Sequence, residues 1–312
     1  MDFLSQIPGG GRIAVVRLRS LGDCVLTTPA LEILRRTRPD CRVAVVVEPR
    51  FADIFLDHPA VDIVLDPSWA AMVRFRPHLC LNLHGGTRSA LLTAASGARW
   101  RAAFAHLPWQ SIYNIRIPRA QEIFGEERTV HTAEHLASAV FHLGAPRCPV
   151  PRAHLTANPS GRSRRYAVLH PMASAANKTW PAERFLAVAR HLRDHHELEP
   201  VFIAGPGEDV SAFAAFTVYR GRPLREIKNL LASASLFAGN DSGPAHMAAA
   251  FGVPVLVLFG ASDPVVWAPW RTLSESIVAP AGDPAGLSAI ETATVIAALD
   301  RLRARAVAGA GA

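Results

Sequence analysis

The feature that most limits the fold of this chain is a set of short, continuous apolar runs, each followed by a turn and a helical pattern. Residues 12–18 read RIAVVRL and residues 42–48 read RVAVVVE, and between them residues 27–37 carry apolar side chains at helical spacing. Strands that are apolar on both faces are typical of parallel sheets covered by helices. The pattern predicts an α/β fold with a doubly wound sheet, in which further strands are expected at 62–66 and 79–85.

A second series of the same kind follows residues 151–165, a segment rich in Pro, Ser, Asn, Gly and Arg that we interpret as an interdomain linker. Each of its expected strands is followed by a turn of the Gly, Pro or Asp type, which again indicates alternating strands and helices. The expected strands are 166–171, 199–206, 217–221, 236–241 and 253–260, and the expected helices are 181–195, 223–234 and 244–251.

The two series predict two Rossmann-like domains, in keeping with a length of 312 residues. We place the first domain at 1–155 and the second at 156–287. Residues 288–312 are expected to form a C-terminal amphipathic helix that packs back toward the N-terminal domain. Because ligands bind at the carboxyl ends of strands in such sheets, the site is expected in a cleft that both domains face.

Composition indicates which kind of partner and which cellular compartment to expect. The formal net charge is +7, which favours an anionic partner, although ordinary solubility of an Arg-rich chain explains it equally well. The four cysteines form no CxxC or Cys/His pattern, which indicates a reducing compartment. The first residues lack the pattern of a signal peptide, and no apolar run approaches the roughly 20 residues that span a bilayer. We expect a cytoplasmic protein whose membrane contact, if any, is peripheral.

The strongest motif is FAGNDSGPAHMAAAFGVPVLVLFG at 237–260. A strand ends near Gly239, a loop of small polar residues follows, and a helix opens near Pro244, where a missing N–H is tolerated. The free N–H groups and positive dipole end of such a helix suit a diphosphate. The alternative is simple helix capping, because Asp, Ser and Gly are good caps.

Two other loops of the second domain follow strands. Lys178 lies in HPMASAANKTWPAERF (170–185), where it could reach an anion, although most lysines are solvated surface residues. Glu208 lies in IAGPGED (203–209) and could accept hydrogen bonds from ribose hydroxyls; alternatively, it complements a helix dipole.

In the first domain, Asp23 lies where the strand at 12–18 gives way to a helix, within RLRSLGDCVLTTPAL. Gly22 would allow the chain to turn so that the carboxylate faces the cleft. The alternative is that Asp23 only caps the helix. The loop LNLHGGTRSALL (81–92) follows another strand and offers Arg88 to an anionic ligand, or is an ordinary capped turn.

No metal ligands are predicted. The pair His131 and His135 in HTAEH has helical spacing but no third partner, and DHHELE (194–199) is typical of a solvated helix end. The chain contains no HExxH and no Asp-x-Asp pair that would hold a cation on a diphosphate. It also lacks GxGxxG, which argues against a nicotinamide dehydrogenase, and it lacks the aromatic and basic interleaving of a nucleic-acid binder.

Three motifs together resemble the bacterial ADP-heptose:lipopolysaccharide heptosyltransferases, glycosyltransferase family 9. They are RIAVVRLRSLGDCVLTTPALEILRR, HPMASAANKTWPAERF and AGNDSGPAHMAAAFGVPVLVLFGASDP, and the similarity runs from about Arg12 to Trp270. The sequence departs from the family at Asn82, where members often carry Asp, and in the ASAAN segment before Lys178.

The resemblance implies a GT-B fold, two Rossmann-like domains that face an interdomain cleft. It implies metal-independent, inverting transfer of heptose from ADP-L-glycero-β-D-manno-heptose to a Kdo or heptose of the lipopolysaccharide inner core, with no cofactor. It assigns Asp23 as the catalytic base. The implied donor-binding residues are Lys178 for the diphosphate, Glu208 for the ribose, and Asp241, Ser242, Gly243 and His246 for the donor loop. Arg17, Arg19 and Arg88 are candidates for attracting the anionic acceptor.

The expected partners are an ADP-sugar donor and a lipid A-Kdo type acceptor at the membrane face, without nucleic acid, and the chain is expected to be a monomer or weak oligomer. The alternatives that remain are another GT-B enzyme, with a different sugar donor or an epimerase activity, and a non-catalytic nucleotide-sugar binding protein.

Overall fold

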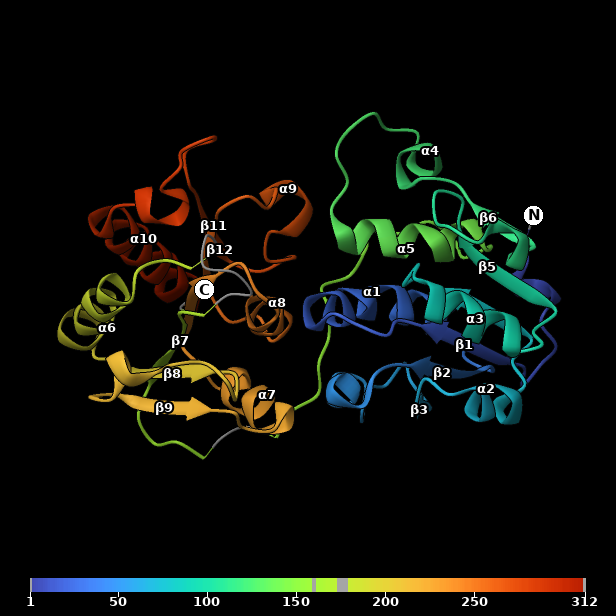
Figure 1. Cartoon of the computed structure of the whole chain (residues 1–312), viewed down its shortest axis with the longest axis horizontal. Helices are drawn as coiled ribbons and strands as arrows, with labels where there is room; N and C mark the ends of the chain where they lie inside the picture. The colour runs from blue at the N-terminus through green and yellow to red at the C-terminus, as the bar shows by residue number, and fades with distance from the viewer. Residues whose placement is uncertain (1, 159–160, 173–178, 311–312) are drawn as a thin grey trace. The chain divides into compact units, whose positions relative to one another are not determined.

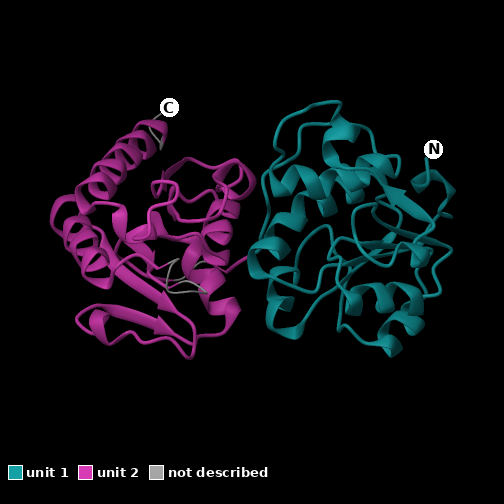
Figure 2. Ribbon diagram, turned by 45° about the horizontal axis from the view of Figure 1, so that its top comes forward, with its two compact units in different colours: residues 1–156 teal, residues 157–312 magenta. Residues whose placement is uncertain are grey.

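The chain folds into two compact units, Met1–Thr156 and Ala157–Ala312, one residue from the predicted boundary (Figure 2). The computed structural model describes residues 2–158, 161–172 and 179–310. No regular element occurs in the described part of the predicted linker, at 151–158 and 161–165. Each unit therefore has its own sheet and its own helices, as the two series of apolar runs predicted.

Unit 1 is built on a six-stranded parallel sheet (Figure 1). Its strands, in the order β3-β2-β1-β4-β5-β6, are β3 (Ile63–Leu65), β2 (Arg42–Val46), β1 (Arg12–Val16), β4 (Leu79–Asn82), β5 (Trp100–Phe104) and β6 (Ile115–Ile117). Its α-helices are α1 (Leu21–Thr37), α2 (Trp69–Phe75), α3 (Thr87–Ala95), α4 (Ala120–Phe124) and α5 (Thr132–His142). Helix α1 packs on α5, and α2 packs on α3.

Unit 2 repeats this arrangement with a second six-stranded parallel sheet. Its strands, in the order β9-β8-β7-β10-β11-β12, are β9 (Thr217–Arg220), β8 (Glu199–Ala204), β7 (Tyr166–His170), β10 (Leu236–Asn240), β11 (Val255–Phe259) and β12 (Ser274–Val278). Its α-helices are α6 (Ala182–His196), α7 (Leu224–Ala232), α8 (Gly243–Ala250), α9 (Pro264–Trp267) and α10 (Thr292–Ala310). Helix α6 packs on α10, and α7 packs on α8.

The two sheets share one topology. Counted from the first strand of its own unit, each sheet has the order 3-2-1-4-5-6, so the strand order reverses between β1 and β4 in unit 1 and between β7 and β10 in unit 2. This reversal is the topological switch point, outside whose strand ends α/β proteins bind ligands. The structure thus marks one expected binding position in each unit.

Burial explains why the central strands were recognisable as apolar runs. Every residue of β4, β10 and β11 is buried, because helices cover both faces of the sheet. The core of unit 2 gathers Trp180 and Phe185 with buried side chains from β7, β8, β10, β11 and α10. Cys24 and Cys80 are also buried.

Three sequence-based expectations about the elements differ from the structure. Helix α1 begins at Leu21 rather than near residue 27, because Ser20 and Asp23 stabilise an earlier start and Pro29 is accommodated inside the helix. Strands β5, β6 and β12 were missed. The C-terminal helix was expected to pack toward the N-terminal domain, but Val295, Leu299 and Leu302 of α10 lie in the core of unit 2.

Among the described residues, none of the helices combines the length and the apolar character that crossing a bilayer requires.

Candidate active site

The predicted site residues of unit 1 lie at its switch point. Arg17 directly follows β1, and Asp23 lies in the first turn of α1. The carboxylate of Asp23 accepts three hydrogen bonds: Oδ2 accepts from the hydroxyl of Ser20 at 2.8 Å and from its N–H at 3.3 Å, and Oδ1 accepts from Nη1 of Arg17 at 3.2 Å. Asp23 therefore does cap the helix, and it also forms an ion pair that capping does not require.

Arg17 is the more deeply placed partner of this pair. Its side chain is 8% exposed, against 23% for Asp23. Its Nε is buried without a hydrogen-bond partner among the described residues. Burial lowers the pKa of Arg17, and the negative charge of Asp23 acts in the opposite direction. A buried cation beside a partly exposed carboxylate is an arrangement that orients the carboxylate and can also attract an anionic ligand.

His84, which sequence reasoning did not single out, joins this group from the end of β4. Its Nδ1 lies 3.2 Å from the carbonyl oxygen of Arg19. Burial lowers the pKa of His84, and the charge of Arg17 lowers it further, so the ring is neutral near pH 7. The loop that carries it is held by the buried Asn82, whose Oδ1 accepts from the N–H groups of His84 and Gly85 at 3.0 and 3.2 Å.

The two histidines of HTAEH have separate structural roles. Nδ1 of His131 accepts from the N–H of Ala133 at 3.1 Å and so caps α5. The ring of His135 stacks on Phe104 with 4.0 Å between the ring centroids. Burial lowers the pKa of His135 to about 4, with further lowering by His106 and Arg17. The charge of Arg17 thus acts on His135 across more than a hundred residues of sequence, which only the fold could show.

The other two candidate arginines of unit 1 are surface residues. Arg19 is exposed and meets His84 through its backbone. The side chain of Arg88, 61% exposed, donates to the carbonyl oxygen of Pro67 at 3.2 Å and lies 3.9 Å from Glu48. The structure therefore joins Arg17 directly to Asp23 but directs Arg88 toward a neighbouring loop.

The donor loop predicted in unit 2 lies at the second switch point. Asn240 ends β10, Ser242 precedes α8, and Gly243 is the first residue of that helix. The hydroxyl of Ser242 lies 3.0 Å from Nδ1 of His170, which ends β7. The buried Asn240 donates to the carbonyl oxygen of Pro171 at 2.8 Å. These contacts tie the end of β7 to the start of α8, so the helix N-terminus is held in place.

Trp180 stabilises the same region by packing in the core of unit 2. Its side chain is fully buried, and its Nε1 donates to the carbonyl oxygen of Ile290 at 2.9 Å. Its backbone N–H donates to Oδ1 of Asn240 at 3.3 Å. The aromatic ring is a packing anchor rather than a stacking surface for a ligand.

The structure describes three of the four remaining candidates for donor binding. Asp241 is half-buried, and its N–H donates to the carbonyl oxygen of Leu258 at 3.0 Å. His246 is buried within α8, with its ring centroid 6.3 Å from that of Trp267. Oε2 of Glu208 accepts from the N–H of Gly205 at 2.5 Å, so this carboxylate braces its own loop. Lys178 lies outside the described residues.

The neutral histidines predict how stability depends on pH. Burial lowers the pKa of His170 to about 4, and that of His135 is also about 4, against about 6.5 in an unfolded chain. The unfolded chain therefore binds more protons between these values, and stability falls as the pH falls from about 6.5 to about 4. Each histidine contributes up to about 1.4 kcal/mol per pH unit in this window.

Urea denaturation at several pH values checks this prediction, with His170→Gln as the comparison. The variant should lose less stability than the wild type between pH 6.5 and 4.5. Equal pH slopes for the two proteins would contradict a neutral, buried His170.

Two parallel α/β units of this strand order, with polar loops at both switch points, define the GT-B class of glycosyltransferases. The structure of a glycosyl transferase family 9 protein from Veillonella parvula is similar to this chain with a TM-score of 0.82 and 20% identity, covering 98% of this chain and 99% of that one. The Escherichia coli heptosyltransferase WaaC with ADP-2-deoxy-2-fluoro heptose has a TM-score of 0.75 and 21% identity, covering 93% and 99%. The predicted GT-B fold is confirmed.

A model of glycosyltransferase family 9 (heptosyltransferase) matches residues 78–285, more than half of the chain, and the chain belongs to this family. Among characterised relatives, lipopolysaccharide heptosyltransferase 3 of Escherichia coli is 26% identical over 344 aligned positions, which cover 91% of this chain and 97% of the relative. The protein is therefore a glycosyltransferase, and the predicted family is confirmed.

Proposed function

We propose that this protein transfers heptose from ADP-L-glycero-β-D-manno-heptose to a Kdo or heptose of the lipopolysaccharide inner core, with inversion at the anomeric carbon. The names of its relatives support both substrates: one relative is a lipopolysaccharide heptosyltransferase, and a structural neighbour is bound to an ADP-heptose analogue. The observation that supports the proposal is that each unit has polar residues at its own switch point, the Arg17–Asp23 pair in unit 1 and the start of α8 in unit 2.

Unit 2 is proposed to bind the donor. The N-terminus of α8 presents its dipole and the N–H of Gly243, and Ser242 is held there by His170. A helix N-terminus stabilises the negative charge that grows on a departing diphosphate. In this proposal Lys178 adds a positive charge, Asp241 and His246 shape the loop, and Glu208 binds the ribose. These groups would perform the role that a metal ion performs in other transferases.

Unit 1 is proposed to bind the acceptor and supply the base. The acceptor oxygen forms a bond to the anomeric carbon as the bond from that carbon to the phosphate oxygen breaks. The hydroxyl proton passes to the carboxylate of Asp23, and ADP leaves with the bonding electron pair. Arg17 holds the carboxylate through Oδ1, so the same pair positions the base before the acceptor arrives.

The acceptor in this proposal is an anionic lipid sugar at the cytoplasmic face of the membrane. A net charge of +7 favours approach to such a surface. Arg17 and Arg19 follow the end of β1, and Arg88 lies at the start of α3. Of these, Arg19 and Arg88 are exposed and would be open to an incoming headgroup, whereas Arg17 is buried.

A panel of donors and acceptors tests the proposed function. ADP-heptose, ADP-mannose, UDP-sugars and GDP-sugars are incubated separately with Kdo-lipid A and with heptosyl-Kdo-lipid A, and nucleotide release is measured. We expect release from ADP-heptose only when one of the two acceptors is present. Release without an acceptor would indicate an epimerase or hydrolase, and binding without release under any condition would indicate a non-catalytic binding protein.

A further inference from the structure

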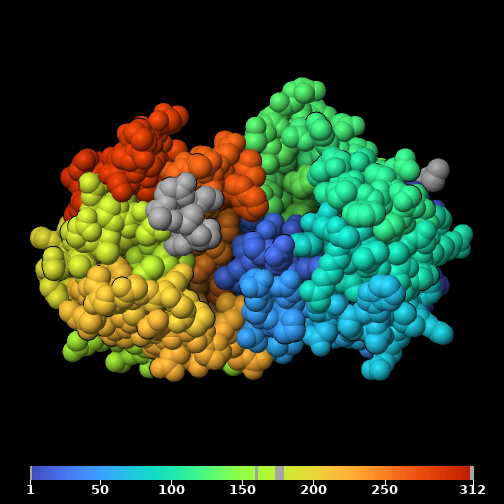
Figure 3. Space-filling view, viewed as in Figure 1, coloured from blue at the N-terminus to red at the C-terminus, as the bar shows by residue number. Residues whose placement is uncertain are grey.

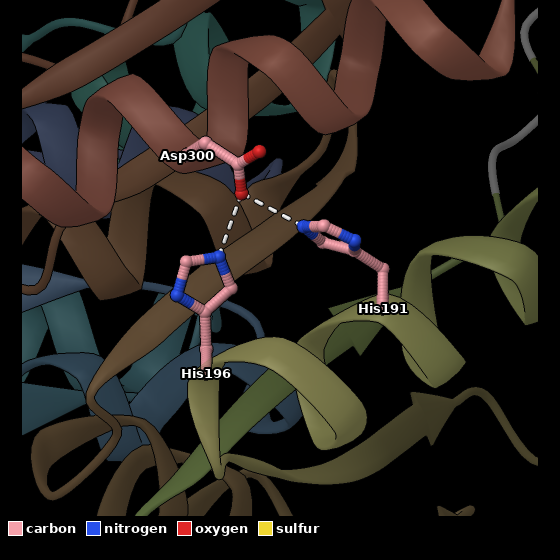
Figure 4. A group of neighbouring side chains, drawn as sticks. All are labelled: His191, His196 and Asp300. Carbon is pink, nitrogen blue, oxygen red and sulfur yellow. Dashed lines mark hydrogen bonds and ion pairs between the residues drawn. The ribbon is translucent and has the colours of Figure 1, made fainter.

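A second polar cluster lies in unit 2 and involves none of the residues proposed for transfer. His191 and His196 on α6 and Asp300 on α10 point their side chains toward one another (Figure 4). Nε2 of each histidine lies 2.7 Å from the same oxygen, Oδ1 of Asp300. The side chains are 16%, 19% and 46% exposed, respectively, so the cluster is open to small solutes.

We propose that His191, His196 and Asp300 bind a divalent transition-metal ion, and that Zn²⁺ is the ion whose ligand chemistry they fit best. Two imidazoles and one carboxylate, with a water as fourth ligand, are a donor set that zinc accepts in tetrahedral geometry. Mg²⁺ and Ca²⁺ prefer sites made of oxygen atoms alone.

The geometry is close to that of such a site. One ligand atom from each residue lies within 4.8 Å of the other two. Zinc–ligand bonds of about 2.0–2.1 Å place tetrahedral ligand atoms about 3.3 Å apart. Each imidazole nitrogen would therefore move away from Asp300 by about 0.6 Å to admit the ion, a distance within the reach of small side-chain rotations.

Acidic side chains offset part of the positive charge around the cluster. Arg193 pairs with Asp194 at 2.8 Å, and Arg301 pairs with Glu275 at 3.2 Å. Arg190, which precedes His191, is exposed, so solvent and salt screen its charge. The carboxylate of Asp300 itself supplies one negative charge. A divalent ion would therefore replace two hydrogen bonds to Oδ1 with stronger coordinate bonds.

The position of the cluster indicates a structural role. His191 lies about 14 Å along α6 from Ala182, because a helix rises about 1.5 Å per residue. Helix α6 follows β7, whose last residue, His170, contacts Ser242 of the donor loop, and the end of α6 leads into β8. The ion would thus join α10 to the second half of α6, away from the end of that helix that is nearer in sequence to β7. Figure 3 shows the red C-terminal helix against the yellow-green segment of α6.

Sequence patterns alone could not reveal this site. His195 and His196 lie in DHHELE (194–199), which has the appearance of a solvated helix end, His191 was not singled out, and no metal ligands were predicted. Asp300 is 104 residues from His196, so no motif of short spacing connects them. The packing of α10 on α6 brings the third ligand into place.

Titration of the metal-free, full-length protein with Zn²⁺ tests the proposal, with calorimetry to give stoichiometry and affinity. The affinity tag must be removed beforehand. We expect one equivalent to bind, and His191→Gln, His196→Gln and Asp300→Asn each to weaken binding at least tenfold. His195→Gln is the matched control, because its ring lies 4.7 Å from that of His191 yet it is not one of the three ligands. This control should bind as the wild type does.

Thermal unfolding gives a second readout that does not depend on activity. Zn²⁺ at a hundredfold excess over its dissociation constant should raise the Tm of the wild type by about 5 °C, and should not raise that of Asp300→Asn. Circular dichroism would verify that the variants fold. The proposal is overturned if the wild type binds no Zn²⁺ up to about 1 mM, or if binding is the same in the three ligand variants as in the wild type.

Discussion

Asp23→Asn should lower kcat by about 10² to 10⁴-fold, the range that a positioned general base contributes, while the dissociation constant for ADP stays unchanged. The reason is that the proposed base and the proposed donor loop lie in different units, Asp23 in unit 1 and Ser242 in unit 2. Steady-state kinetics with ADP-heptose and its acceptor measure the first quantity, and calorimetry with ADP measures the second.

Asp23 also caps α1, so an effect on catalysis must be distinguished from a loss of stability. The structure offers a control for this. Ser20→Ala removes the hydroxyl that donates to Asp23 at 2.8 Å but leaves the carboxylate in place. Loss of a capping interaction costs about 0.5–2 kcal/mol of stability and should change kcat only slightly. If Asp23 acts only as a cap, both variants will lose similar stability and both will retain activity, which would remove Asp23 from the catalytic assignment.

The ion pair between Arg17 and Asp23 also affects how the Asp23→Asn variant must be measured. Asn in place of Asp23 leaves the buried guanidinium of Arg17 without its negative partner, and breaking a buried pair can cost several kcal/mol. Kinetics should therefore be compared at a temperature where urea denaturation shows the variant to be folded. Unchanged ADP binding then reports directly that unit 2 is intact.

Trp180→Ala should lower the free energy of unfolding by about 3–5 kcal/mol, the range for truncating a large buried aromatic residue. The indole is fully buried, lies edge-on to Phe185 with centroids 5.0 Å apart, and donates to the carbonyl oxygen of Ile290. Its loss leaves a cavity between the donor-loop region and the segment that leads to α10. We expect weaker ADP binding as well, because the backbone of Trp180 donates to Asn240.

Trp69→Ala is the matched control, because the side chain of Trp69 is 64% exposed. Surface substitutions of this kind usually change stability by less than about 0.5 kcal/mol. Urea denaturation of both variants measures the difference. Equal losses of unfolding free energy in the two variants would contradict the prediction that the buried position of Trp180 makes it more important for stability.

The central strands were predictable because their burial on two faces produces continuous apolar runs. Such runs predicted six of the strands, namely β1, β2, β4, β7, β10 and β11. Strand β12 was missed because it lies at the sheet edge and reads SESIV, with no residue fully buried. Strands β5 and β6 were missed for related reasons: an arginine interrupts each of them. Polar or charged residues within a strand weaken the apolar run by which the central strands were recognised, although the edge strands β3 and β9 were still predicted.

Contacts among the candidate site residues could be anticipated where the residues are close in sequence, and not where the fold brings distant residues together. Asp23 and Arg17 lie six residues apart and could be considered as one motif. His84 and His135 reach the same region from β4 and α5, and His170 meets Ser242 across 72 residues. Their contributions depend on strand order, which sequence spacing does not encode. Capping by Asp23 was one of the two interpretations of the sequence, but the helical start at Leu21 became visible only in the structure.

The repeated 3-2-1-4-5-6 order has an evolutionary consequence. Each unit contains a complete sheet, a complete core and one switch point, and the chain passes between the units only once, at Thr156–Ala157. Substitutions that alter the loops of one unit leave the sheet of the other intact. Under the proposed division of labour, recognition of the nucleotide sugar and of the receiving sugar can diversify on separate halves of the gene. Recombination at this single junction could therefore pair an old donor half with a new acceptor half in one step.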